Sequence, residues 1–132
     1  MSVGYLADSF DLINVRDLDL IAQAYAQCSR LVLGVFTDEY AERVFGRRPV
    51  VPLSERIALL RHVRGVSDAV PHSADVEPIL AEVEVVFVAA DVPVQVIEGP
   101  VVLTPRRHTD SPVLRSALQA ADLQGVDGEA VA

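Results

Sequence analysis

The chain has 132 residues, about half of them apolar, and a formal net charge of −8. These values predict one domain with a sizeable core, and the acidic balance argues against general binding to nucleic-acid backbones. No apolar run is long enough to span a bilayer, so we expect no membrane partner. No basic region precedes an apolar stretch at the start, so we expect no signal peptide. The single cysteine, Cys28, excludes an internal disulfide and fits a reducing cytoplasm, where we place the protein.

Short apolar runs alternate with amphipathic stretches through the first third of the chain. Residues 2–6 and 31–36 are predicted to be buried strands, and residues 17–29 between them are predicted to be a helix. Strand, helix and strand over about 35 residues indicate a parallel βαβ unit with a right-handed crossover. The apolar residues that recur at helical spacing, and that we expect to face inward, are Leu18, Ile21, Ala22, Tyr25 and Cys28.

The same alternation continues to residue 121. Thr37 or Asp38 is expected to cap a helix that ends at Phe45, and Ser111 or Pro112 is expected to open a last helix. The elements expected between them are a helix over 53–63, a strand over 68–71, a short helix over 76–83, a strand over 85–90, and a fifth strand over 94–97 or 101–103. This order predicts a three-layer α/β/α sandwich with a mostly parallel, five-stranded sheet over residues 1–121, followed by a flexible tail over 122–132.

The loop after the first strand is the predicted ligand site. In α/β proteins a ligand usually sits at the carboxyl end of a strand, and the free N–H groups of the next helix suit a phosphate. Here the loop contains Ser9, Phe10 and Asp11, and the helix is expected to begin near Asp17, as its N-cap or first-turn acid.

This loop resembles the opening of the cytidylyltransferase-like nucleotidyltransferases, of the glycerol-3-phosphate cytidylyltransferase type. That family has a Phe-Asp-Leu segment followed by His-x-Gly-His, and the latter window is Asn14-Val15-Arg16-Asp17 in this chain. The resemblance continues through further segments: 34–39, 46–52 with Glu55-Arg56, 66–70, 86–91 and, more loosely, 104–111.

The resemblance implies a Rossmann-like fold, a nucleoside triphosphate such as CTP or ATP, and Mg²⁺ carried with the nucleotide. It also implies transfer of the nucleotide to a phosphorylated alcohol or sugar, and often a homodimer. The positions that would bind the nucleotide are Ser9, Phe10, Asn14, Asp17, Arg47, Arg48, Arg56, Asp91, Arg106, Arg107, Thr109 and Ser111.

Both histidines of the motif are replaced, which predicts impaired catalysis. Phosphoryl-type transfer needs positive charge where negative charge develops, but Asn14 is neutral and Asp17 is an acid. Two negative charges ~4 Å apart repel by roughly 4 kcal/mol at an effective dielectric near 20. Asp8 adds a second acid. Arg16 replaces a glycine, so it either adds bulk or acts as a replacement cation.

Each candidate also has a purely structural interpretation. Asn14 and Asp17 serve equally well as turn and cap residues. All eleven basic residues are arginines, and Arg47, Arg48 and Arg56 are expected to be solvated or paired with Glu42 and Glu55 rather than to bind nucleotide. The densest basic run, which could form an anion site with Thr109 and Ser111, is Arg106-Arg107-His108.

The remaining reactive side chains predict little chemistry. His62 and His72 are expected at the surface, Cys28 in the core, and no zinc held by protein ligands.

Three functions follow as hypotheses. The first is a pseudoenzyme that binds a nucleotide or phosphometabolite, or that acts as a homodimer or as a partner of another enzyme. The second is an active nucleotidyltransferase whose cations are Arg16 with Arg47, Arg48 or Arg106. The third is an interaction domain without a nucleotide.

Overall fold

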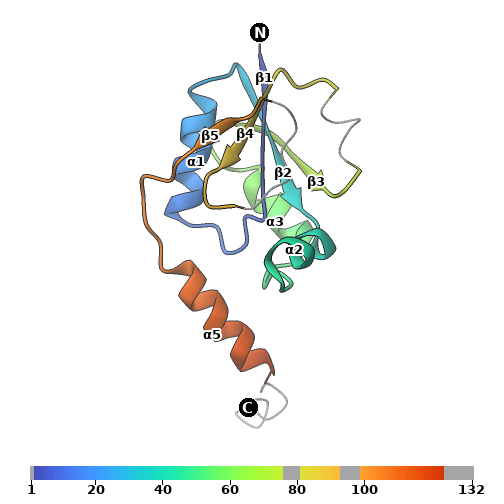
Figure 1. The fold of residues 1–132 in the computed structure, drawn as a ribbon, viewed down its shortest axis with the longest axis vertical. Helices are drawn as coiled ribbons and strands as arrows, with labels where there is room; N and C mark the ends of the chain where they lie inside the picture. Colours follow the sequence, from blue (N-terminus) through green and yellow to red (C-terminus); the bar gives the residue numbers. More distant parts are fainter. Residues whose placement is uncertain (1, 76–80, 93–98, 124–132) are drawn as a thin grey trace.

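Five parallel strands form the centre of the molecule (Figure 1). The computed structural model describes residues 2–75, 81–92 and 99–123. The strands lie in the order β3-β2-β1-β4-β5, and Leu6 on the central strand is level with Leu33 and Phe87. Their bounds are β1 (Val3–Asp8), β2 (Arg30–Phe36), β3 (Val66–His72), β4 (Val85–Ala89) and β5 (Val101–Leu103). The predicted five-stranded parallel sheet is confirmed.

Helices cover both faces of this sheet, as the predicted sandwich requires. One core contains Leu20 and Ile21 of α1 (Val15–Tyr25) with Leu60 of α3 (Leu53–Leu60). On the other side, α2 (Asp38–Phe45) packs through Ala41 against Tyr5 in a second core. The strand order reverses between β1 and β4, and crevices at such reversals are where parallel sheets bind ligands.

The predicted inner face of the first helix is right only for Ile21, which is buried, whereas Leu18, Ala22 and Tyr25 are exposed. Asn14 caps α1, because its side-chain oxygen accepts from the backbone N–H groups of Arg16 and Asp17 at 3.0 and 3.2 Å. The helix therefore begins at Val15 and ends at Tyr25, and its buried residues are Asp17, Asp19, Leu20, Ile21 and Ala24. Leu18 and Tyr25 are 44% and 49% exposed, so the buried stripe is rotated away from them. Cys28 lies beyond the helix, half-buried against the core.

Other boundaries differ by a few residues. The first strand reaches Asp8 rather than residue 6, and this places a carboxylate at its end. Thr37 caps α2 as predicted, through its hydroxyl oxygen and the Tyr40 N–H. The fifth strand is the 101–103 alternative. The predicted elements over 76–83 and 94–97 fall wholly or mainly outside the described residues.

The last helix stands apart from the sheet (Figure 1). This is α5 (Ser111–Leu123), which continues slightly beyond the predicted end at 121. The side facing the body is polar: Arg47 donates to Ser116 and Gln119, and Gln119 donates to the Arg48 carbonyl at 2.8 Å. Its apolar side chains point outward, with Val113 71% and Leu114 55% exposed.

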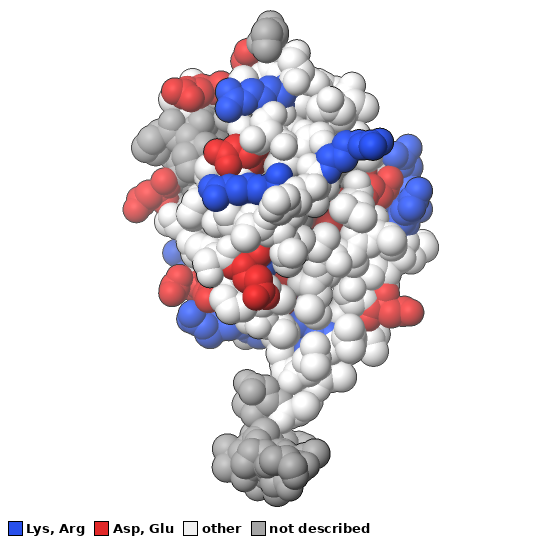
Figure 2. All heavy atoms as spheres, turned by 180° about the vertical axis from the view of Figure 1, so that it is seen from behind, with Lys and Arg blue, Asp and Glu red and all other residues white. Residues whose placement is uncertain are grey.

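No helix in the described part of the chain combines the length and the apolar character needed to cross a membrane. Figure 2 shows acidic and basic side chains scattered among neutral areas, with no continuous basic band over the described residues of that face.

Candidate functional site

Two adjoining hollows open at the carboxyl end of the sheet, between the β1–α1 loop, the segment after β4, and α5. The larger, about 250 Å³, is the basic hollow, lined by residues that include Ser9, Asp11, Phe45, Arg47, Arg48 and Arg115. The smaller, about 180 Å³, is the acidic hollow, lined by residues that include Asp8, Asn14, Arg16, Asp17, Asp91 and Thr109. They share Ser9, Asp11, Phe45, Pro112 and Arg115, so they form two arms of one cleft.

The loop between β1 and α1 is held in an unusual backbone conformation. Phe10 and Leu12 have φ values of 52° and 53°, in the left-handed region that costs a non-glycine residue energy. The burial of the Phe10 side chain in the main core offsets the energy of its backbone conformation. Asp11 accepts bonds from the backbone N–H groups of Val50 and Val51 at 2.8 and 2.9 Å. The loop is therefore fixed to the segment before α3.

Arg56 has a structural role that contradicts the predicted one. Its side chain is fully buried, whereas we expected a solvated residue or a pair with Glu55. It donates to the carbonyls of Ser9 and Phe36 at 2.8 and 2.7 Å, and to that of Val51 at 2.8 Å. Its fourth bond goes to Asp38 at 2.6 Å.

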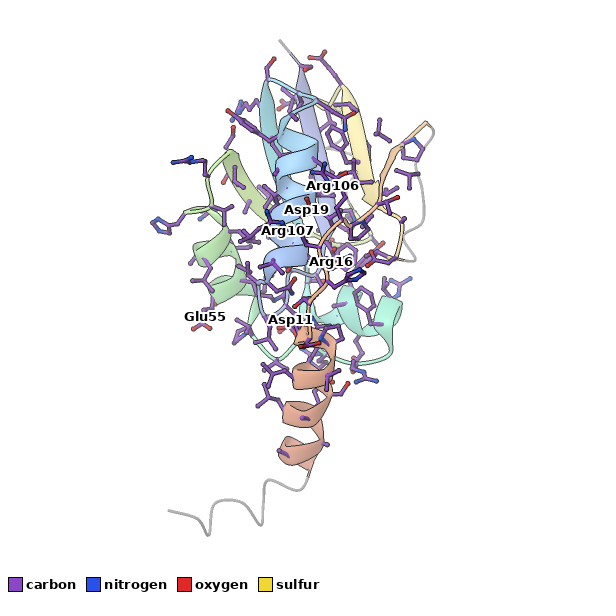
Figure 3. The ribbon with its side chains drawn as sticks, turned by 90° about the vertical axis from the view of Figure 1, so that its left-hand side faces the viewer. Asp11, Arg16, Asp19, Glu55, Arg106 and Arg107 are labelled. Atoms are coloured by element: carbon purple, nitrogen blue, oxygen red, sulfur yellow. The ribbon has the colours of Figure 1, made fainter. Side chains whose placement is uncertain are left out.

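Glu55 instead lies exposed on the outer side of α3 (Figure 3). Since Arg56 is the helix position that faces the sheet, it ties the ends of β1 and β2 to the loop before α3.

Arg16 lies at the centre of the acidic hollow, engaged by three carboxylates. Its Nη1 donates to Asp8 at 3.1 Å and to Asp17 at 2.8 Å. Its Nε and Nη2 donate to the two oxygens of Asp91 at 2.9 and 2.5 Å, a paired geometry typical of arginine with a carboxylate. These neighbours raise the pKa of Arg16 further, despite its burial. One guanidinium is thus shared among three carboxyl groups.

Asp17 has a pKa well above the ordinary value of an aspartate. Burial, with a smaller contribution from the charge of Asp8, raises its pKa to about 7, although Arg16 acts in the opposite direction. Burial likewise raises the pKa of Asp8. By contrast, the hydrogen bond from Arg16 lowers the pKa of Asp91. The second oxygen of Asp17, Oδ2, is buried and has no hydrogen-bond partner among the described residues.

Three arginines line the basic hollow. Arg48 lies 3.6 to 3.8 Å from carboxylate oxygens of Asp38, Glu39 and Glu42, which confirms the expected pairing with Glu42. Arg115 was not among the predicted site residues. It donates through Nη2 to the Asp11 carbonyl at 2.9 Å, and its Nε is 3.2 Å from Asp11 Oδ2. No local pattern in the sequence marks Arg115, because Ser111, one helical turn earlier on α5, does not itself line the cleft.

The basic run Arg106-Arg107-His108 does not line the cleft. Arg106 bonds to Asp19 on α1 through its backbone N–H at 2.8 Å and its guanidinium at 3.1 Å, and these bonds lower the pKa of Asp19 (Figure 3). Arg107 is exposed, and Ser111 bonds to the Thr109 hydroxyl. Of the predicted anion site, only Thr109 lines either hollow.

The predicted site residues therefore separate into two groups. The cleft brings together Ser9, Phe10, Asn14, Arg16, Asp17, Arg47, Arg48, Asp91 and Thr109. The residues that do not line it are Arg56, Arg106, Arg107 and Ser111.

The prediction that His72 is at the surface is wrong. It is buried, and its Nδ1 lies 2.7 Å from the hydroxyl of Tyr5, whereas His62 is exposed as expected. Over residues 2–75, 81–92 and 99–123, no three histidine, cysteine or acidic residues are grouped as a metal site would need.

Comparison with known proteins gives a consistent family match. The model of the family described as cytidylyltransferase-like matches residues 6–99. Proteins named bifunctional protein HldE are similar: that of Caulobacter sp. (strain K31) is 36% identical over 67 residues, half of this chain and 14% of its own length. That of Mesorhizobium japonicum is 29% identical over 103 residues, 75% of this chain and 21% of its own length. The chain thus spans about a fifth or less of these relatives.

A solved structure shares the fold. The lipopolysaccharide core biosynthesis protein from Thermoplasma volcanium GSS1 superimposes with a TM-score of 0.70 at 16% identity, covering 83% of this chain and 99% of that one.

Proposed function

This chain belongs to the cytidylyltransferase-like family, and we propose that its cleft binds a phosphorylated small molecule without transferring a nucleotide to it. The family uses nucleoside triphosphates and phosphosugars, so CTP, ATP and phosphometabolites are the ligand classes to consider. The proposal separates two properties, binding and catalysis, which depend on different arms of the cleft.

The observation that carries the loss of catalysis is the position of Arg16. A nucleotidyl transfer needs free positive charge or donors at the phosphate where negative charge develops. Among the described residues, two cations line the acidic hollow. Arg16, at the start of α1, is already bonded to Asp8, Asp17 and Asp91, and Arg115 is already paired with Asp11. A phosphate placed there would have to displace a carboxylate from Arg16 and would meet the others at close range.

The basic hollow supports the binding part of the proposal. Arg47, Arg48 and Arg115 line it together with the hydroxyl groups of Ser9 and Ser116. Arginine suits phosphate because its fork of N–H donors matches the oxygens and its charge is permanent. Arg48 is also 3.6 to 3.8 Å from three carboxylates, but Arg47 bonds only to the neutral side chains of Ser116 and Gln119 among the described residues. The charged groups lining this arm are therefore three arginines and Asp11, whereas four aspartates and two arginines line the other.

A pyrophosphate-release assay tests the loss of catalysis. The full chain is incubated with Mg²⁺ and CTP or ATP, and with a panel of phosphorylated alcohols and sugars. An active member of the family, run beside it, shows that the conditions permit turnover. We expect no pyrophosphate above the background of the nucleotide alone, and Mg²⁺-dependent turnover would contradict the proposal.

The competing function is an active nucleotidyltransferase that uses Arg16 with Arg47 or Arg48 as its cations. Under that alternative, Arg16→Ala abolishes turnover, and Glu55→Gln on the far side of α3 leaves it unchanged. Calorimetry on the same sample with CTP, ATP and the phosphorylated alcohols and sugars shows whether the chain binds any of these ligands. Absence of heat at millimolar ligand would favour the interaction domain.

A homodimer is the second proposed role. The resemblance predicted it, and the apolar side of α5 offers a surface for a second copy, since Val113 and Leu114 are exposed there. Sedimentation analysis should give a dimer that Leu114→Asp dissociates. A monomer at micromolar concentration would contradict this role.

A further inference from the structure

The outward side of α1 is apolar, although the side that faces the sheet contains two acids. Asp17 and Asp19 are buried, at 3% and 8% exposure. A helix on the surface of a soluble protein normally has the reverse arrangement, with its apolar residues inside and its charges outside. The exposed residues, which we call the α1 row, are Val15, Leu18, Ala22 and Tyr25. The α1 row thus has the composition of a buried face but lies at the surface.

The α1 row has the spacing at which helices pair. Its members are separated by three, four and three residues, so they align along one side of α1 as the a and d positions of a coiled coil do. The helix has 11 residues, which makes it about 16 Å long. A second helix of similar length can therefore pack along the whole row. None of its members lines the cleft.

An arginine borders the α1 row on the side of the segment that leads to α5. Arg106 is bonded to Asp19 through its backbone N–H at 2.8 Å and its guanidinium at 3.1 Å. These bonds hold the segment against α1 and place Arg107, which is exposed, next to the helix (Figure 3). The positive charge of Arg107 is therefore available beside the row.

A second arginine borders the row on the side of α3. The ring of Tyr25 lies against Gly65, so closely that a Cβ at this glycine would be 3.1 Å from the ring. Arg64, the preceding residue, is exposed in the same turn. The one acid of α3, Glu55, lies in the first turn of that helix, at the end remote from Gly65. The acids of α1, a helix that the structure describes throughout, are both buried.

We propose that the α1 row docks an acidic amphipathic helix of a partner protein. The apolar side of that helix packs along the row, and the carboxylates beside its apolar residues face Arg107 and Arg64. In helix pairs of this kind the apolar seam supplies the affinity, and the flanking charges select the partner and its orientation. The inference goes beyond the proposed function, because the α1 row lies outside the cleft.

Two other occupants fit this surface less well. A second copy would place row against row and bring the arginines of both copies together, with no exposed acid of α1 to compensate them. The net charge of −8 on each copy adds to this repulsion. A membrane surface favours a helix with a wide apolar face and a strongly basic surround, whereas the α1 row is a narrow seam.

Fluorescence anisotropy with designed peptides tests the proposal. The full chain is titrated into a labelled helical peptide of about 15 residues, a length near the minimum for helix formation in water. The peptide has leucines at alternating three- and four-residue spacing and glutamates beside them, and its matched control has lysines in place of the glutamates. We expect the acidic peptide to bind about tenfold or more tightly than the basic one. The difference should shrink at high salt.

Variants locate the binding surface. Leu18→Glu and, separately, Ala22→Glu change exposed side chains, and each should weaken binding of the acidic peptide about tenfold or more. Leu118→Glu is the matched control, because this leucine is similarly exposed, at 41%, but belongs to α5, and binding should stay as in the unaltered chain. Arg107→Gln should bring the affinities for the two peptides closer together. Circular dichroism checks that each variant is folded.

The remaining outcomes overturn the proposal. They are equal binding of the two peptides, binding of neither, and binding of the acidic peptide that both glutamate changes leave intact. Sedimentation that shows a dimer dissociated by Leu18→Glu assigns the row to a second copy. Flotation with vesicles of phosphatidylglycerol and phosphatidylcholine that Leu18→Glu abolishes assigns it to a membrane. The proposed function of the cleft stands or falls separately from all of these results.

Discussion

Replacing Arg56 by methionine should destabilise the domain more than any other single charge removal. Methionine approximates the length of the side chain but supplies no donor. The carbonyls of Ser9 and Phe36, bonded at 2.8 and 2.7 Å, would then lie buried without a partner, and Asp38 would lose its closest cation.

The magnitude follows from these contacts. Leaving a buried acceptor unpaired costs about 1–3 kcal/mol, and two such carbonyls give roughly 2–6 kcal/mol. Asp38 adds less, because its side chain is 28% exposed and water can replace the guanidinium. We therefore expect the free energy of unfolding to fall by about 3–5 kcal/mol. This is a large share of the roughly 5–15 kcal/mol typical of a domain.

Urea unfolding followed by circular dichroism measures the effect. Arg48→Met is the matched control: the Arg48 side chain is 51% exposed, and its carboxylate partners lie 3.6 to 3.8 Å away, so its loss should cost under about 1 kcal/mol. If both variants lose a similar, small amount at an unchanged m-value, Arg56 does not hold the loop and the reasoning is refuted.

Three further changes have predictable effects on unfolding. Burial lowers the pKa of His72 to about 4, so below about pH 6.5 the unfolded chain takes up a proton that the folded chain excludes, and the free energy of unfolding falls with pH by on the order of 3 kcal/mol. His72→Gln should remove that slope between pH 6.5 and 4, as urea titrations would show; an unchanged slope would count against it. Asp17 has the opposite sign: its pKa is raised to about 7, so stability is present below its ordinary pKa near 3.8 and is lost as pH rises towards 7. Asp17→Asn should flatten this decline in the same titrations, and a persisting decline would assign it to other groups. A Cβ at Gly34 would overlap the Tyr5 hydroxyl, so Gly34→Ala should cost about 1–3 kcal/mol and lower Tm, whereas an unaltered Tm would show that the ring moves freely.

Most of the architecture could be predicted because the sheet is parallel and buried. Runs such as residues 31–36 are apolar on both faces, a pattern that few other structures satisfy. The rotation of α1 could not be predicted, because Leu18 and Tyr25 have helical spacing although the sheet lies on the side of Leu20 and Ala24. Periodicity gives the spacing of a face, but the neighbouring elements decide which face is buried.

The location of the candidate site could be predicted, but the hydrogen-bond partners of its residues could not. The place of the β1–α1 loop follows from the predicted βαβ unit, because the loop lies at the carboxyl end of the first strand, and Asn14 and Asp17 line the cleft there. The partners of Arg56 and Arg106 are backbone carbonyls and an acid far away in sequence, and no local pattern announces such bonds. Arg115 was missed for the same reason, because its importance depends on α5 lying across the cleft.

The outer wall of the cleft is formed by α5, which contacts the body of the domain through polar side chains. Since α5 attaches through side chains such as Arg47 and Gln119, and its apolar residues stay outside, exchanging this helix should alter what the domain accepts while leaving its thermal melting almost untouched. The ligand selectivity and the thermal stability of the domain could therefore be changed separately. A designer could replace α5 with a different helix after residue 110 and change selectivity without rebuilding the interior.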